Sequence, residues 1–357
     1  MINRKSLIFA IILTLSAIAT LNAAENSALE RSVREAELAF GKSAVEHFEQ
    51  MFQSGKFDFK TYGYRGVTVL HYAVFINDQE RVKLLIEKGA DVNAKDIDST
   101  TLLMAATDNN NMEITKLLVE NGADVNAKDR SGDIAIFYAA LNGNMEMVQY
   151  LIENGADITI TNTKWNRNII HYAARSGNLE LVQYLVNQGI SVLESNGALH
   201  KAVSSGNLEL VKWLVAHGAD VHGDYFNDSV LLYAVRSSNK DILRYLVEEK
   251  GVDVNESANR KMDYSALEEA VKNNNIETVK YLVEHGARIH SHQGYFFLLF
   301  EYYQGEIDPE IVSYLRDHDP VIKGFAITLS LIFLIVVSAI VYFVYRIIRP
   351  KKPAEIK

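Results

Sequence analysis

Hydrophobic and small residues recur along most of this 357-residue chain at the spacing of short amphipathic helices. In residues 168–189 one segment carries a small apolar face, and the next carries an apolar stripe at i, i+4 spacing. These positions are Ile170, Ala173 and Ala174, then Leu181, Val182, Leu185 and Val186. Gly177 separates the segments, and Gly189 supplies the left-handed stop that glycine adopts at low cost. The pattern predicts two short helices that approach closely through alanine.

The same pattern returns along the chain, and a glycine closes each copy. These residues are Gly55, Gly89, Gly122, Gly155, Gly189, Gly218, Gly251 and Gly286, with gaps of 34, 33, 33, 34, 29, 33 and 35 residues. One helix pair cannot bury its apolar faces alone, so neighbouring copies must stack on one another. The spacing therefore predicts an all-α repeat solenoid.

Two copies carry nearly the same sequence around the glycine. Residues 84–96 read LLIEKGADVNAKD, and residues 117–129 read LLVENGADVNAKD. This register resembles the ankyrin repeat, whose unit is a β-turn followed by two antiparallel helices. The resemblance implies stacked ankyrin helix-turn-helix units with β-turn fingers.

The chain departs from that family at the start of the first helix. Where the family has Thr-Pro-Leu-His, the proline is absent from every copy, as in the sequence TVLH at residues 68–71. Proline at the first helical position sets φ in advance, so its loss should make each unit somewhat less stable. His71, His171 and His200 match the family histidine, and the resemblance implies a structural role in which each bonds the neighbouring turn.

The register divides the chain into regular repeats and less regular ends. Seven units are clear in residues 64–288, and the 29-residue gap implies a shortened turn at residues 193–196. Residues 27–60 and 289–319 resemble degenerate capping repeats, which a solenoid needs in order to cover its terminal apolar faces.

The N-terminal residues have the plan of a secretory signal peptide. Arg4 and Lys5 precede an apolar run at residues 7–18, and small residues follow up to Ala23. Cleavage after Ala23 would make residues 1–23 the signal peptide, and the alternative is an uncleaved signal anchor. Both readings place the repeats on the same side of the membrane.

A second apolar segment lies near the C-terminus and predicts one transmembrane helix. Residues 324–345 contain no charged residue and, at ~1.5 Å per residue, would span about 33 Å, enough for the hydrocarbon core. The tail at residues 346–357 is basic, and basic flanks stay in the cytoplasm. We therefore expect a single-pass membrane protein with its repeats outside the cytoplasm, periplasmic or extracellular, and a cytoplasmic C-terminus. The span has no GxxxG pairing motif, so we expect a monomer.

Charge and cysteine content narrow the possible functions. Residues 25–324 carry 29 Lys and Arg against 44 Asp and Glu, a net charge of −15. Such a domain repels polyanions, and it has no basic stripe that would bind nucleic acid. Cysteine is absent, which excludes disulfides, thiol catalysis and thiolate metal sites. Absent cysteine with many Asn, Ile and Lys favours a bacterial origin.

No catalytic or phosphate-binding motif occurs, so we expect neither an enzyme nor a cofactor. The nearest approach to a metal site is the cluster of His285, His290 and His292. It has no carboxylate at ligand spacing beside it, which favours solvated turn histidines over a ligand set. A metal-binding or enzymatic accessory protein that uses this cluster is nevertheless one alternative function.

The resemblance implies that a protein partner meets the finger tips and the exposed side of the first helix. Aromatic residues and arginine dominate those positions, and they are the residue types that most often carry interface energy. The candidate protein-binding residues are Tyr72, Phe75, Tyr138, Trp165, Tyr172, Arg175, Tyr225, Phe226, Tyr233, Arg236 and Tyr264. The alternative for each tyrosine is packing on the next unit's turn as part of the scaffold.

These features favour a membrane-anchored scaffold that binds another protein on the non-cytoplasmic side of the membrane. The identity of that partner is not fixed by the fold. The second alternative is an adaptor whose repeats face the cytoplasm, as most proteins of the resembled family do.

Overall fold

The computed structural model describes residues 42–57, 59, 66–193, 195, 197–225, 228–256, 265–289, 307–318 and 322. The predicted signal peptide (1–23), transmembrane helix (324–345) and basic tail (346–357) lie outside these residues. In the described part of the chain, no helix is both long and apolar enough to cross a membrane.

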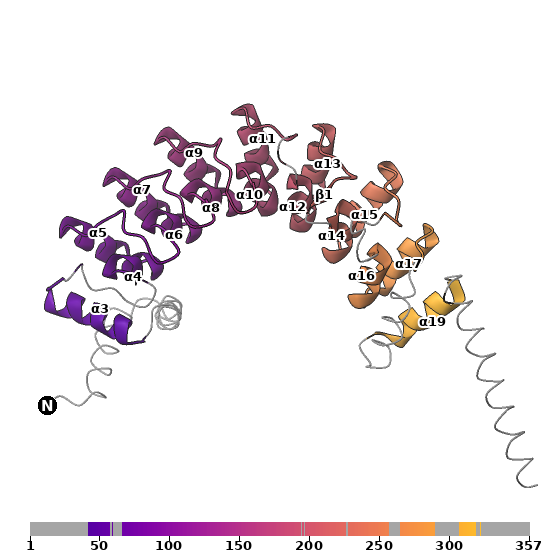
Figure 1. The fold of residues 1–357 in the computed structure, drawn as a ribbon, viewed down its shortest axis with the longest axis horizontal. Coiled ribbons are helices and arrows are strands. Elements are labelled where there is room, and N and C mark those ends of the chain that lie inside the picture. The colour runs from indigo at the N-terminus through magenta and orange to yellow at the C-terminus, as the bar shows by residue number, and fades with distance from the viewer. Residues whose placement is uncertain are drawn as a thin grey trace, which may run out of the picture. The chain divides into compact units, whose positions relative to one another are not determined.

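Residues 1–195 form one compact unit, in which helix pairs follow a single helix. Its described helices are α3 (Lys42–Ser54), α4 (Val69–Phe75), α5 (Gln79–Glu87), α6 (Leu102–Asp108), α7 (Met112–Glu120), α8 (Ala135–Leu141), α9 (Met145–Glu153), α10 (Ile169–Ser176) and α11 (Leu179–Asn187). Figure 1 shows α4, α6, α8 and α10 in one row, with α5, α7, α9 and α11 in a second row beside it. The all-helical repeat fold predicted from the sequence is confirmed.

Each helix pair begins and ends at residues whose chemistry fits the position. The second helices start at an Asp or Asn whose side chain accepts a backbone N–H of the first turn, as Asn144 does from Met147. The pair ends at a glycine with positive φ, such as Gly155 at 88° and Gly189 at 99°. The left-handed stop predicted from the glycine spacing is therefore present.

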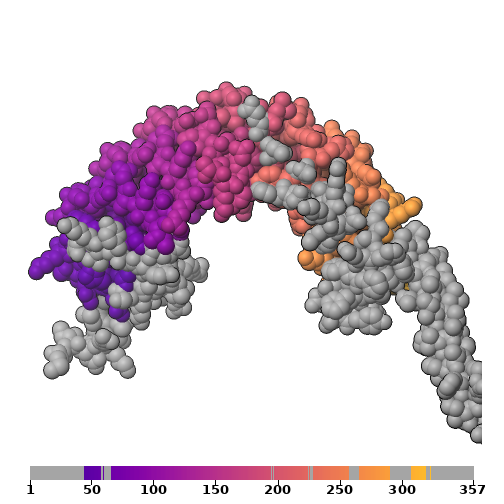
Figure 2. All heavy atoms as spheres, in the orientation of Figure 1, coloured from indigo at the N-terminus to yellow at the C-terminus, as the bar shows by residue number. Residues whose placement is uncertain are grey.

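The core lies between the two helix rows and between successive pairs. A leucine at the equivalent position of each second helix is fully buried, namely Leu85, Leu118, Leu151 and Leu185. Small residues on the first helices, such as Ala106 and Ala139, are fully buried as well, which lets neighbouring helices approach closely. Figure 2 shows that side chains fill the spaces between the ribbons of α4 to α11, so the pairs form one packed body.

Two buried histidines of the first helices, His71 and His171, bond the start of their own helix. His71 is buried, and its Nδ1 accepts a hydrogen bond of 3.2 Å from the Thr68 amide. His171 does the same for the amide of Asn168. Burial lowers the pKa of His71 to about 4, although Asp96 and the backbone of Thr100 in the next turn act in the opposite direction.

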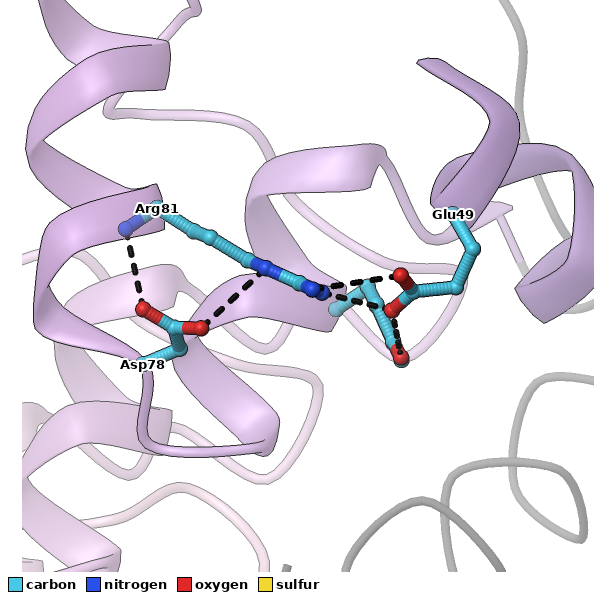
Figure 3. Close-up of polar contacts among 4 residues, drawn as sticks. Glu49, Asp78 and Arg81 are labelled. Carbon is cyan, nitrogen blue, oxygen red and sulfur yellow. Dashed lines mark hydrogen bonds and ion pairs between the residues drawn. The ribbon is translucent and has the colours of Figure 1, made fainter. Parts of the chain in front are cut away.

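Helix α3 packs on the first pair through one arginine and one glutamate (Figure 3). Arg81 Nη1 and Nη2 donate to the two carboxylate oxygens of Glu49 over 2.5 and 3.1 Å, and the Tyr72 hydroxyl donates to Glu49 over 2.6 Å. Asp78 lies 3.1 Å from Arg81 Nε on the other side. The guanidinium also lies 4.4 Å from the ring centre of Phe52. A charged network therefore joins α3 to the first pair.

Asparagine side chains link successive repeats at two places in this unit. Asn93 Nδ2 donates to the carbonyl of Gly122 over 2.9 Å, and Asn93 Oδ1 accepts from the Asp124 amide over 2.8 Å. Asn126 makes the same two bonds to Gly155 and Asp157. We call this pair of bonds the asparagine clamp. It explains the register Gly-Ala-Asp-Val-Asn, because the last residue binds the first and third residues of the following copy.

The clamp residue is not kept in every copy. Thr159, Leu193 and His222 stand four residues after their glycines, where three other copies have Asn93, Asn126 and Asn255. Thr159 bonds back to Asp157 of its own turn, and Leu193 is 72% exposed. His222 Nδ1 lies 3.2 Å from a Glu256 oxygen.

Residues 196–357 form the second compact unit. Its described elements are α12 (Ala198–Ser205), α13 (Leu208–Ala216), β1 (Asp224–Tyr225), β2 (Asp228–Ser229), α14 (Val230–Arg236), α15 (Lys240–Arg244), η3 (Tyr245–Glu249), α16 (Ala266–Lys272), α17 (Ile276–Glu284) and α19 (Pro309–His318). The strands β1 and β2 pair antiparallel in a short hairpin before α14. Helix α19 packs on α17, where Lys280 Nζ donates to Glu310 over 3.0 Å.

One second helix of this unit contains an extra residue. Asn239 and Gly251 are twelve positions apart, whereas Asn207 and Gly218 are eleven apart. The chain takes up the difference in the π-helical turn η3, where the Lys250 amide bonds the carbonyl of Tyr245 five residues earlier. Leu246 consequently stays fully buried.

Candidate binding surface

Three loops of the first unit precede first helices and are called fingers here. They are residues 94–101, 127–134 and 160–168, which lead into α6, α8 and α10. In the first two fingers an aspartate folds the loop on itself. Asp96 Oδ1 accepts the amides of Asp98 and Thr100, and Asp129 Oδ1 accepts the amide of Asp133. These carboxylates therefore act as turn acceptors.

Asn162 organises the third finger. Its side chain is 1% exposed, and its Oδ1 accepts the amides of Trp165 and Arg167 over 3.0 and 3.2 Å. Its Nδ2 donates to Asp133 Oδ1 and to the Tyr172 hydroxyl, each over 3.0 Å. The Tyr172 hydroxyl donates in turn to Asp133. One buried amide thus fixes the finger backbone and ties it to the first helix α10.

The second and third fingers are joined at their tips. The Thr163 amide donates to the Ser131 carbonyl over 3.0 Å, and Gly132 follows directly. A Cβ at Gly132 would lie 2.7 Å from the Thr163 nitrogen, so only glycine fits there. On the other side of the second finger, Arg130 donates to Asp98 through its backbone and its side chain.

The tyrosines beside the fingers have hydroxyls that stay protonated. Tyr172 stacks on Phe137 with ring centres 4.7 Å apart. Burial, with the hydrogen bond to Asp133, raises the pKa of Tyr172 well above its usual value. Burial also raises the pKa of Tyr138, and Asp129 and Asp133 add to the effect. Both phenols therefore remain protonated at neutral pH.

Two cationic side chains lie over the ring of Trp165. Lys164 Nζ lies 4.3 Å and the Arg167 guanidinium carbon 4.8 Å from the ring centre. Trp165 is partly exposed, and Arg175 is exposed one turn beyond Tyr172 on α10. The arrangement presents an aromatic ring and positive charge to solvent.

In the second unit, Arg236 connects two acidic residues. Its Nη1 donates to Asp228 over 2.5 Å, and its Nε lies 3.1 Å from a Glu269 oxygen. Burial lowers the pKa of Arg236, but the bond to Asp228 and the charge of Glu269 outweigh it and leave this pKa raised. The ring of Tyr233 meets His200 edge to face at 5.1 Å. These contacts tie the first helices α12, α14 and α16 of this unit together.

The structure places the predicted binding residues in three situations. Tyr72 and Tyr225 are 0% and 7% exposed, so both belong to the scaffold rather than to an open surface. The partly or largely exposed residues are Phe75, Tyr138, Trp165, Tyr172, Arg175, Tyr233 and Arg236. Phe226 and Tyr264 lie outside the described residues. Whether the exposed ones touch a partner stays a prediction.

Sequence reasoning missed the aromatic residues of the second helices. A partly exposed aromatic stands five residues before the closing glycine in several copies, namely Tyr150, Tyr184, Trp213 and Tyr281. Trp213 stacks on His217 with ring centres 3.7 Å apart, and Tyr281 lies 4.1 Å from His285. The constant spacing of five residues before the closing glycine could have revealed these aromatic residues from the sequence.

The histidine cluster considered as a metal site is only partly described. His285 Nδ1 lies 2.8 Å from the carbonyl of Tyr281, and its Nε2 lies 3.7 Å from Glu248. His290 and His292 lie outside the described residues. Among the residues that the structure does describe, no group of three or more potential ligands comes together.

Comparison with known proteins agrees with the helix-pair architecture. A family model described as ankyrin repeats (3 copies) matches residues 38–129, 70–162, 136–224 and 199–293, which together make up well over half of the chain. No curated protein matches the chain. The crystal structure of the human ASB11 ankyrin repeat domain aligns with 62% of this chain and 99% of its own, at 25% identity and a TM-score of 0.49.

Proposed function

Because the chain belongs to the ankyrin-repeat family, we propose that it is a scaffold whose fingers and first helices bind another protein. Repeats of this family are typically interaction domains rather than enzymes. The observation that carries the proposal is the Asn162 network, which holds Trp165 and Tyr172 in place before any partner arrives. A surface that is already ordered loses little conformational entropy on binding, so more of the contact energy appears as affinity.

Site-specific photocrosslinking in living cells tests this proposal. A photoreactive phenylalanine analogue replaces Trp165 in one variant, and replaces Gln149, exposed on the second helix α9, in a matched variant. We expect a discrete adduct with one protein from the Trp165 position and none from the Gln149 position. Adding Asn162→Ala should abolish the adduct, because the finger loses the acceptor of two backbone amides. Equal adducts from both positions would contradict a binding surface on the fingers.

We further propose that the protein is an exported, membrane-anchored bacterial protein with its repeats on the non-cytoplasmic side. The apolar residues 324–345, the basic tail after them and the signal-like residues 1–23 support this topology. An alkaline phosphatase fusion after residue 320 should be active, and deletion of residues 1–23 should abolish that activity. An inactive full-length fusion would favour the alternative of repeats that face the cytoplasm.

A further inference from the structure

The repeat that contains Trp165 differs in charge from the domain around it. From Ile158 to Leu179 the chain carries Lys164, Arg167 and Arg175 and no acidic residue. Residues 25–324 as a whole carry a net charge of −15. The third finger and its first helix are therefore a local positive patch on a negative domain.

Two cations of this repeat, Lys164 and Arg175, are poorly neutralised within the described part of the chain. In the described part of the chain, Lys164 and Arg175 form no ion pair, whereas Lys116 pairs with Glu146 on the second helices of the same unit. Asp133 does lie against the third finger, but its Oδ1 takes hydrogen bonds from Asn162 and Tyr172. The charge of Lys164 and Arg175 thus remains available to a ligand.

The geometry of the patch suits carboxylate groups next to an aromatic platform. Lys164 Nζ lies 4.3 Å from the ring centre of Trp165, so an acidic side chain that meets this cation also approaches the indole, and the Arg167 guanidinium lies 4.8 Å from the same ring. Arginine can bind a carboxylate through two parallel hydrogen bonds. The finger backbone is fixed by Asn162, which positions these groups in advance.

We propose that this patch, formed by Lys164, Trp165, Arg167 and Arg175, binds an acidic polypeptide segment of the partner. The inference rests on the proposed function and names the chemistry that the fingers recognise. A short acidic segment fits the limited area of positive charge. A long polyanion such as nucleic acid would meet the negative remainder of the domain and be repelled.

Fluorescence anisotropy with defined probes tests the inference on the full-length chain. The probes are short fluorescein-labelled peptides of alternating Glu and Ser and of alternating Gln and Ser, with labelled oligothymidylate for comparison. We expect the Glu peptide to bind, the Gln peptide to bind at least about tenfold more weakly, and added salt to weaken the Glu peptide. The double change Lys164→Glu with Arg167→Glu should weaken binding of the Glu peptide by about tenfold or more.

A matched charge change elsewhere separates local recognition from net charge. Lys83→Glu with Lys88→Glu alters two exposed lysines of the first helix pair by the same total charge, and should leave the affinity nearly unchanged. An equal loss in this control, or equal binding of Glu and Gln peptides, would overturn the inference. Oligothymidylate that binds as tightly as the Glu peptide, with the same sensitivity to the Lys164 and Arg167 changes, would assign the patch to nucleic acid.

The crosslinking and peptide-binding results together distinguish failure of this inference from failure of the proposed function. If the Trp165 crosslink forms in cells while the Glu peptide does not bind, the fingers bind a protein by other chemistry. If both results are negative, the finger surface itself is not a binding site. Circular dichroism of each variant confirms that the helices are intact before its affinity is compared.

Discussion

Replacing Asn126 with alanine removes one complete asparagine clamp and nothing else of comparable size. The side chain donates to the Gly155 carbonyl and accepts the Asp157 amide, each over 2.8 Å. Both partners belong to the following repeat. The change therefore tests whether single side chains set the coupling between neighbouring repeats, as the geometry indicates.

The expected magnitude follows from the two hydrogen bonds and their exposure. A typical intramolecular hydrogen bond contributes about 1 kcal/mol net, and the groups left behind here can bind water because the clamp is near the surface. We expect Asn126→Ala to lower the free energy of unfolding by about 1 to 2 kcal/mol. Asn126→Asp keeps an acceptor for the Asp157 amide and loses the donor to Gly155, so it should cost less than alanine does.

Urea unfolding followed by circular dichroism at 222 nm measures the effect as a shift in midpoint. Asn93→Ala removes the equivalent clamp to Gly122 and Asp124 and should cost a similar amount. Asn154→Ala is the control, because Asn154 bonds only the carbonyl of Tyr150 in its own helix. If the Asn154 variant loses as much stability as the Asn126 variant, coupling between repeats does not depend on the clamp. If the slope of the unfolding free energy against urea concentration is the same for both proteins, they unfold in the same transition and their midpoints can be compared.

Three further changes follow from the same structure. Thr159→Asn should add a clamp to Gly189 and raise stability by about 1 kcal/mol, and a fall in the urea midpoint would refute this. Gly132→Ala places a Cβ 2.7 Å from the Thr163 nitrogen at a φ of 82°, so it should destabilise by about 2 kcal/mol or more in the same assay. His71 has a folded pKa of about 4 against 6.5 when unfolded, so the unfolded chain binds more protons between these values. Stability should therefore fall as pH drops from 6.5 to 4, by at most about 3 kcal/mol from this residue. His71→Met, which copies the next repeat at the equivalent position, should reduce that slope, and identical slopes in both proteins would refute the assignment.

The helix pairs could be predicted from the sequence because their causes are local. The glycine that closes each pair, the capping Asp or Asn and the buried leucine all stand at fixed offsets within one repeat. The asparagine of the register could also be seen in the sequence. Its role in linking repeats could not be predicted, because both of its side-chain bonds are made to the next repeat, and only folding brings those groups within 3 Å.

The candidate surface was predictable only in part for the same reason. Trp165 and Arg175 remain open to solvent, as their positions in the repeat implied. Tyr72 was expected at the surface by the same rule, but helix α3 places Glu49 against its hydroxyl. That helix belongs to the less regular N-terminal end of the chain, where Gly55 keeps the register but the helix sequence departs from it, so repeat periodicity says little about what the helix covers. Asn162, which organises the surface, gave no signal because its importance comes from four partners in two repeats.

The π-helical turn η3 shows how this architecture can change length without changing its stacking. The additional residue is accommodated before Gly251, and Leu246 keeps its place in the core. The repeat that follows η3 therefore keeps the same stacking as the repeat that precedes it in this unit. Insertions at the end of a second helix are then nearly neutral for the fold, whereas an insertion between the clamp asparagine and its glycine would misalign both bonds of the clamp. Natural length variation in such a protein should accumulate at the first kind of position and be absent from the second.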